Sequence, residues 1–216
     1  QAGCALIGGE MAEHPGLMHA GEFELVGFSV GVVDKHEMIT RESVTPDDVI
    51  IGLHSPGLRS NGYSLARKVF FDTAKKSIHD PVWDGTDVTV GEELLRPSVI
   101  YTPTVLKVLE QNQVKAIAHI TGGGLPGNVN RVLPDDMDAE IRKETWSPPR
   151  IFTEIQSLGN IDEGEMFKVF NMGIGMVLIV DQQSVDSTQE IIDATGLSSI
   201  QIGTVKANGT GSVEIV

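Results

Sequence analysis

VIIGLHSPGLRSNGYSLARKVFFDTA, residues 49–74, carries the strongest structural pattern of this chain. Its first five residues form an apolar run that is typical of a buried strand. A turn at Ser60-Asn61-Gly62 follows, and after it apolar residues recur at helical spacing. The helical stripe consists of Leu65, Ala66, Val69, Phe70 and Ala74. A strand that passes through a glycine turn into a helix is a building unit of mixed α/β folds.

The chain beyond residue 74 continues this alternation. Strands are predicted at residues 114–118, 137–142, 174–180, 200–206 and 212–216, the last two as a closing pair. Helices are predicted behind Thr102-Pro103, after Gly127, and at residues 149–158 and 185–194. Residues 78–97, rich in Pro and Gly, are predicted as a long irregular insertion. The pattern predicts an α+β fold, built as a mixed α/β sandwich.

The first part of the chain differs from the rest. Residues 3–7 and 22–34 read as strands, the second with Gly27 and Gly31 as bends. We place a domain boundary near residue 38, which divides the chain into residues 1–37 and 38–216.

Composition limits the possible functions. A chain of 216 residues with 40% hydrophobic and 21% charged residues has the composition of an ordinary globular protein. Its formal net charge of −14 opposes nonspecific binding to nucleic acids or anionic membranes. No stretch reaches the ~20 apolar residues of a membrane span. The single cysteine excludes an internal disulfide and suits a reducing, cytoplasmic location.

The turn at Ser60-Asn61-Gly62 is the first candidate binding site. Unpaired N–H groups at a helix start attract anions, and Arg59 adds a positive charge beside the turn. We expect Gly62 to admit a phosphate while Ser60 and Asn61 orient it. The alternative is an ordinary capped helix with solvated cations.

A second candidate is Thr121-Gly122-Gly123-Gly124, which follows a predicted strand and precedes a predicted helix. Three consecutive glycines cost backbone entropy, so we favour a functional reason for them. The motif is neither a P-loop nor a dinucleotide fingerprint. His119 just before it is a candidate for proton transfer or hydrogen bonding, or a core histidine bonded to backbone. Two glycine turns of this kind suggest a ligand with more than one anionic group.

Two further groups are weaker candidates. Glu10 and Glu13 could hold Mg²⁺ through carboxylate oxygens, although the residues alone favour an exposed acidic loop. Asn171 lies among glycines that a tight strand entry explains, so a ligand role is the less favoured interpretation.

Taken together, several motifs resemble one enzyme family, and they span essentially the whole chain in order. They are Gly8-Gly9-Glu10-x-Ala12-Glu13-x-Pro15-Gly16, Gly27-Phe28-x-Val30-Gly31, Ser60-Asn61-Gly62-Tyr63-Ser64-Leu65, Ala118-His119-x-Thr121-Gly122-Gly123-Gly124, Arg131-Val132-Leu133-Pro134 and Phe170-Asn171-x-Gly173-x-Gly175-Met176. The chain resembles the phosphoribosylformylglycinamidine cyclo-ligases, or aminoimidazole ribonucleotide synthetases, of purine biosynthesis.

The resemblance implies an ATP- and Mg²⁺-dependent ligase that closes the ring of formylglycinamidine ribonucleotide. It implies that residues 1–37 are the last strands of an amino-terminal domain that binds ATP and forms dimers. Residues 38–216 would then be the complete carboxy-terminal domain. The chain would be incomplete and inactive alone, whereas the full-length protein would be a cytoplasmic homodimer.

The resemblance also assigns roles to residues. Glu10 and His119 would be catalytic, and Glu10 with Glu13 would bind the metal. The substrate would contact Arg59, Ser60, Asn61, Gly62, Thr121, Gly122, Gly123, Gly124 and Asn171.

This chain departs from the family pattern at three positions. Met11 replaces a usual Thr, Arg59 replaces a common His, and Asn130 replaces a Pro. Two other interpretations stay open. One is another ATP-using member of the superfamily, such as a selenophosphate synthetase or a thiamine monophosphate kinase. The other is a noncatalytic ligand-binding module.

Overall fold

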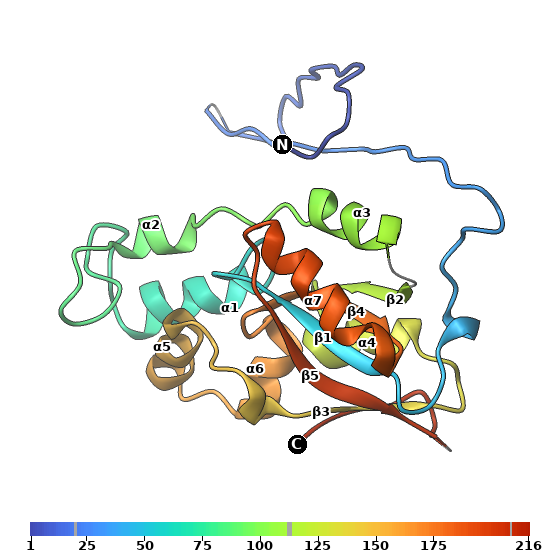
Figure 1. The fold of residues 1–216 in the computed structure, drawn as a ribbon. Helices are drawn as coiled ribbons and strands as arrows, with labels where there is room; N and C mark the ends of the chain where they lie inside the picture. The colour runs from blue at the N-terminus through green and yellow to red at the C-terminus, as the bar shows by residue number, and fades with distance from the viewer. Residues whose placement is uncertain (20, 112–113, 208) are drawn as a thin grey trace.

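The body of the protein is a six-stranded mixed sheet with helices on both faces (Figure 1). The computed structural model describes residues 1–216 except 20, 112, 113 and 208. The strands are β1 (Val49–His54), β2 (Val114–His119), β3 (Asp138–Ile141), β4 (Ile174–Val180), β5 (Ser199–Lys206) and β6 (Val213–Ile215). Their order is β2-β4-β1-β5-β3-β6, and every pairing is antiparallel except that of β3 with β6.

Each face of the sheet has its own apolar core. One core packs against α1 (Tyr63–Arg67), α4 (Gly124–Val129), α5 (Arg150–Gly159) and α6 (Glu163–Val169). The other packs against α3 (Thr102–Gln111) and α7 (Val185–Ala194). Along β1, Ile50 enters the first core while Ile51 and Leu53 enter the second. A strand buried on both faces reads as a continuous apolar run, which explains the sequence pattern at residues 49–53.

Most predicted elements are confirmed, with boundary shifts of a few residues. The helix predicted after Gly127 begins earlier, at Gly124, inside the glycine run. The helical stripe after Gly62 forms α1 and then widens into a π-helix, Lys68–Thr73. Helix α6 was not predicted. The mixed α/β fold itself is confirmed.

Two predictions about the sheet and its loops need correction. The last two strands do not pair with each other, because β3 lies between β5 and β6. The insertion at residues 78–97 is not wholly irregular, since it contains α2 (Val90–Leu94). This helix starts with a capping box in which Thr89 and Glu92 bond each other's backbone. The Thr-x-x-Glu spacing was present in the sequence as a signal for it.

The strands predicted at residues 3–7 and 22–34 are not formed. This part of the chain runs as an extended segment outside the body (Figure 1), and its apolar side chains, such as those of Leu6, Phe28 and Val32, are exposed. A strand needs neighbours for its backbone hydrogen bonds and its apolar face, and this segment has none within the described residues. The domain boundary near residue 38 stays a prediction.

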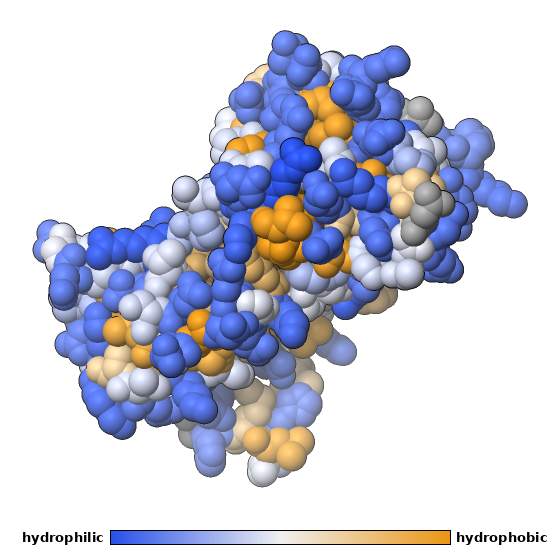
Figure 2. Space-filling model, turned by 90° about the horizontal axis from the view of Figure 1, so that it is seen from below, coloured by the Kyte–Doolittle hydropathy of each residue, from blue (hydrophilic) through white to orange (hydrophobic). Residues whose placement is uncertain are grey.

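The face drawn in Figure 2 is mostly hydrophilic, with apolar side chains gathered in a few separate groups. Among the described residues, no helix has the length and apolar character needed to cross a bilayer.

A buried ion pair joins the start of β1 to β2. Lys115 Nζ lies 2.6 Å from Asp48 Oδ1, and the Asp48 side chain is only 3% exposed. The Thr45 backbone N–H also donates to this carboxylate, at 2.7 Å. Removing the lysine would leave a buried negative charge with hydrogen bonds but no counter-charge.

We therefore predict that Lys115→Met lowers the free energy of unfolding by about 3 kcal/mol. The matched control is Lys143→Met, because Lys143 pairs with Glu163 at 2.5 Å on the surface, where the side chains are 42% and 56% exposed. That control should lose less than about 1 kcal/mol. Urea unfolding followed by tryptophan fluorescence measures both, and equal losses would show that the Asp48 pair has no special weight.

Candidate functional site

The two glycine corners predicted from the sequence lie side by side. Strands β1 and β2 both run antiparallel to β4 and flank it, so they are parallel to each other and end at the same edge of the sheet. The loops that follow them therefore meet. Asn61 Oδ1 lies 3.5 Å from the position that a Cβ atom on Gly122 would occupy. The sheet topology thus brings the Ser60-Asn61-Gly62 corner against the 121–124 corner, and we call this place the junction.

The guanidinium of Arg59 links the two sides of the junction. Its Nη1 donates to the carbonyl oxygens of Ile120, at 3.2 Å, and Gly175, at 2.5 Å. Its Nη2 forms a close contact with His119 Nε2. Arg59 has a left-handed φ of 67°, a conformation that is rare for residues other than glycine. The side chain thereby reaches from the loop after β1 to the end of β2 and the start of β4.

The ring of Tyr101 packs against the Arg59 guanidinium. The Arg59 Cζ atom lies 5.4 Å from the centre of the Tyr101 ring, which is a cation–π contact. The Tyr101 hydroxyl donates to the His54 carbonyl oxygen at 2.8 Å. Burial raises the pKa of Tyr101 against the opposing charge of Arg59, so the phenol stays neutral beside the guanidinium.

His119 is held in its neutral form. The imidazole reaches the surface, yet the protein around it removes enough water to lower its pKa, and the charge of Arg59 lowers that pKa further. Both effects favour the uncharged ring at neutral pH. Ser60, Gly122 and Gly123 are exposed next to it, and Asn61 is half-buried. These groups offer a hydroxyl, an amide and backbone at one open surface.

Asn171 lies beneath the first corner. Its amide nitrogen donates to the carbonyl oxygens of Gly57, at 2.9 Å, and Leu58, at 3.3 Å, while its oxygen accepts from the Gly173 N–H at 2.8 Å. The nitrogen end of this buried amide thus holds the loop that leads to Arg59, while the oxygen end closes the turn that Asn171 itself begins. The structure shows a supporting role for Asn171, and its predicted contact with the substrate stays a prediction.

Asn128 supports the second corner in the same way, and sequence reasoning gave it no role. Its amide nitrogen donates to the Gly124 carbonyl oxygen at 2.7 Å and to that of Thr121 at 3.3 Å. The Thr121 hydroxyl donates to the Asn128 side-chain oxygen at 3.0 Å. Thr121 therefore faces its own loop. A buried asparagine among small and apolar residues of α4 was the available signal.

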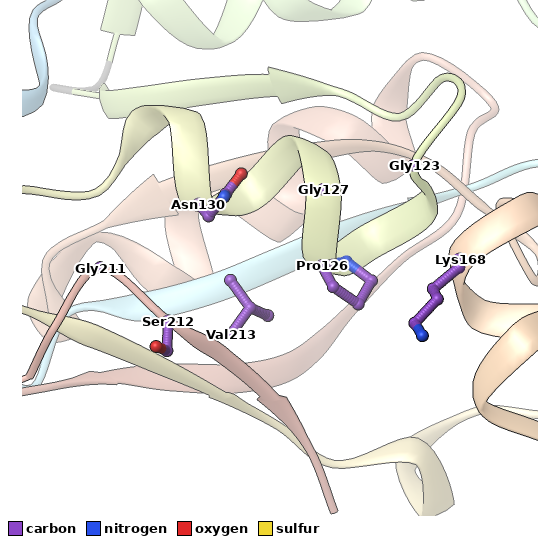
Figure 3. A pocket seen from close by; sticks show the side chains of 8 residues that line it. All are labelled: Gly123, Pro126, Gly127, Asn130, Lys168, Gly211, Ser212 and Val213. Atoms are coloured by element: carbon purple, nitrogen blue, oxygen red, sulfur yellow. The ribbon is translucent and has the colours of Figure 1, made fainter.

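A pocket of about 590 Å³ borders the second corner of the junction, at Gly123. It lies between α4, the end of α6 and the start of β6 (Figure 3). Its lining residues are Gly123, Pro126, Gly127, Asn130, Lys168, Gly211, Ser212 and Val213. Gly123 belongs to the second corner, but no residue of the first corner lines this pocket. Ser60, His119, Gly122 and Gly123 of the junction are exposed at the surface.

Comparison with known proteins decides the family. Residues 45–216 match the family described as AIR synthase related protein, C-terminal domain. The chain belongs to this family. Two similar relatives are named phosphoribosylformylglycinamidine cyclo-ligase. The one from Geobacter metallireducens is 49% identical and the one from Trichlorobacter lovleyi 46% identical, each matched over 100% of this chain. The chain spans 62% of the length of both.

Solved structures show the same fold at low sequence identity. A thiamine-monophosphate kinase from Stenotrophomonas maltophilia has a TM-score of 0.56 at 13% identity and covers 85% of this chain and 54% of its own. The hydrogenase maturation protein HypE in complex with ATP has a TM-score of 0.55 at 13% identity, covering 82% and 49%. The architecture of AIR synthase related proteins is thus shared among proteins with different names.

The two carboxylates to which the family resemblance assigned the metal belong to the exposed first segment of the chain and not to the junction. Glu10 and Glu13 are both exposed in the extended first segment. No cluster of three or more His, Cys, Asp or Glu side chains suited to a metal ion occurs among the described residues. Their roles as catalytic and metal-binding residues stay predictions.

The glycines of the junction have packing reasons that the sequence did not reveal. A Cβ on Gly62, whose φ is +80°, would lie 2.3 Å from a ring carbon of Phe170. A Cβ on Gly124, whose φ is +59°, would lie 1.8 Å from the Phe167 carbonyl oxygen. Gly122 has no positive φ, and its nearest neighbour would be Asn61. The Phe170 ring and the left-handed backbone thus give a packing reason for Gly62, and its predicted contact with a phosphate stays a prediction.

We predict that Gly62→Ala lowers the free energy of unfolding by about 2 to 4 kcal/mol, because the methyl group overlaps Phe170 and the left-handed backbone is strained. Gly127→Ala is the matched control, since a Cβ there meets nothing within 4 Å and the residue lies inside α4. It should be neutral or stabilise by up to about 1 kcal/mol. Thermal or urea unfolding compares the two, and a neutral Gly62→Ala would remove Phe170 as the reason for this glycine.

Proposed function

We propose that the whole protein is an ATP-dependent ligase that closes the imidazole ring of formylglycinamidine ribonucleotide. The observation that carries this proposal is the junction, where two corners offering polar groups and backbone are joined by one arginine. Support also comes from the relatives of 46% and 49% identity that carry the cyclo-ligase name.

The junction suits the phosphorylated end of such a ribonucleotide. Ser60 and Asn61 supply a hydroxyl and an amide, and the Arg59 guanidinium supplies positive charge in a chain of net charge −14. Local donors of this kind hold a phosphate more strongly than the average field of the protein repels it, because the overall charge is spread and screened. We place the ribose phosphate here, with His119 at its edge.

The proposed reaction uses ATP as a second substrate. The terminal phosphoryl group of ATP passes to the formamide oxygen and ADP is released. An amidine nitrogen then attacks the activated carbon, a C–N bond forms, and phosphate leaves with the former formamide oxygen as a proton is lost. Phosphoryl transfer depends mainly on positioning and charge stabilisation, which polar corners provide.

The role of Mg²⁺ is proposed separately from the junction. The described residues do not form a metal site, since Glu10 and Glu13 stand in an exposed segment without a third ligand. We keep their role in Mg²⁺ binding as a proposal and assign no step of the reaction to it. Dimerisation and a cytoplasmic location are likewise proposals for the full-length protein.

Turnover by the full-length protein tests this function. We expect it to convert formylglycinamidine ribonucleotide and MgATP into aminoimidazole ribonucleotide, ADP and phosphate, and we expect the 216-residue chain alone not to do so. Asn61→Asp should raise the KM for the ribonucleotide about tenfold or more, because a carboxylate repels the substrate phosphate; this corresponds to about 1.4 kcal/mol.

Asn160→Asp is the matched control, since it makes the same change at an exposed residue after α5 and should leave the KM unchanged. Absence of aminoimidazole ribonucleotide, together with phosphorylation of thiamine monophosphate or with formation of selenophosphate, would assign the chain to another activity. Absence of any ATP turnover together with tight ribonucleotide binding would indicate a noncatalytic module.

A further inference from the structure

We infer that Arg59 is a positioning residue that fixes His119 as a neutral Nδ1–H donor, aimed at an anionic oxygen of the ligand bound at the junction. The inference about the tautomer follows from the geometry, and its use in ligand binding rests on the proposed function.

Several contacts fix the position of the guanidinium. Nη1 is committed to two backbone carbonyl oxygens, those of Ile120 at 3.2 Å and Gly175 at 2.5 Å. The Tyr101 ring covers the group at 5.4 Å. The left-handed backbone of Arg59, with φ 67°, is strained, and these contacts must offset the strain. The arginine cannot turn away from His119 without losing them.

The chemistry of the pair determines the tautomer. A guanidinium has only N–H groups and no acceptor, so in its contact with Nη2 the His119 Nε2 atom must accept. A neutral imidazole has one acceptor and one donor nitrogen, and the proton therefore resides on Nδ1. In the described part of the chain no hydrogen bond engages His119 Nδ1, which leaves this N–H available to a ligand.

Charge at the site favours the same state. Burial and the charge of Arg59 both lower the pKa of His119, and protonation of the ring would set two donors against each other. The charged group that acts on the ring is Arg59, which also lies against the neutral phenol of Tyr101. Among the described residues no carboxylate pairs with Arg59, and its buried Nε has no hydrogen-bond partner.

Two consequences follow for the site. The positive charge of Arg59 is not neutralised by an ion pair within the described residues, so it remains to attract an anion. His119 cannot act as a general base through Nε2, because that lone pair is occupied by Arg59. The histidine instead donates a hydrogen bond, and the proton released in ring closure must go elsewhere.

The test is long-range ¹H–¹⁵N NMR of the imidazole rings in the 216-residue chain, with His119→Gln used to assign the signals. We expect His119 to be mainly the Nδ1–H tautomer in the wild-type protein. Arg59→Lys keeps one cationic donor and should retain this tautomer. Arg59→Met removes the donors, and His119 should then become mainly the Nε2–H tautomer that a free imidazole prefers.

Arg67→Met is the matched control, because Arg67 is exposed on α1, and it should leave His119 unchanged. Unchanged backbone amide signals of β3 and β5, which lie away from Arg59 in the sheet, report an intact fold in each variant. A mainly Nε2–H ring in the wild-type protein, or an unchanged tautomer in a folded Arg59→Met variant, would overturn the inference. If Arg59→Met does not fold, the wild-type and Arg59→Lys spectra decide the question by themselves.

A second measurement separates this inference from the proposed function. Added ribose 5-phosphate should shift the His119 Nδ1 signal of the wild-type protein, while the signals of the other histidines, which serve as internal references, should stay in place. An Nδ1–H tautomer that ribose 5-phosphate does not perturb would confirm the role of Arg59 and contradict the ligand assignment. A ring that ribose 5-phosphate perturbs but that carries its proton on Nε2 would support the ligand assignment and contradict the role of Arg59.

Discussion

The contact of the Arg59 guanidinium with the ends of β2 and β4 is the interaction on which the candidate site depends. Without it, the loop after β1 and the loop after β2 would be neighbours only through the sheet. With it, the carbonyl oxygens of Ile120 and Gly175 and the ring of His119 are tied to the residue that precedes Ser60 and Asn61. A single cation thus connects both corners, and Asn171 and Asn128 hold each loop from beneath.

Under the proposed function, a strongly acidic chain has to bind an anion at the junction. The net charge of −14 is distributed over the surface, where solvent screens it. At the junction the balance is local: one guanidinium without a carboxylate partner among the described residues, a hydroxyl and an amide. The neutral state of His119 adds a donor without a second positive charge. Binding at such a place depends on the geometry of a few donors and only weakly on total charge.

The sequence was sufficient to predict the fold class and most of the elements that follow residue 48. Apolar runs such as that of β1, and helical stripes such as that of α7, are local signals. The position of β3 between β5 and β6 depends on pairing between distant segments, which periodicity cannot report. Residues 3–7 and 22–34 have the composition of strands, but composition supplies no neighbour to pair with. The capping box of α2 was a readable signal that the surrounding Pro and Gly obscured.

The candidate site was predictable in its parts and not in its physical reasons. Both corners were recognised from glycine turns before helices. Their meeting depends on β1 and β2 flanking β4, which is a property of the topology. Gly62 was predicted to admit a phosphate, which stays a prediction, and the packing of the Phe170 ring against Gly62 could not be read from the sequence. The hydrogen bonds of Arg59 and Asn128 depend on how the chain folds, and no spacing in the sequence predicts them.

A titration of the 216-residue chain with ribose 5-phosphate, followed by backbone amide NMR, tests most directly whether the two corners form one anion-binding surface. The account predicts that the amide signals of Asn61 and Gly62 and those of Gly122 and Gly123 shift together with one dissociation constant. Gly196, which lies in the turn after α7, should not move. Shifts confined to one corner, or two different dissociation constants, would contradict it.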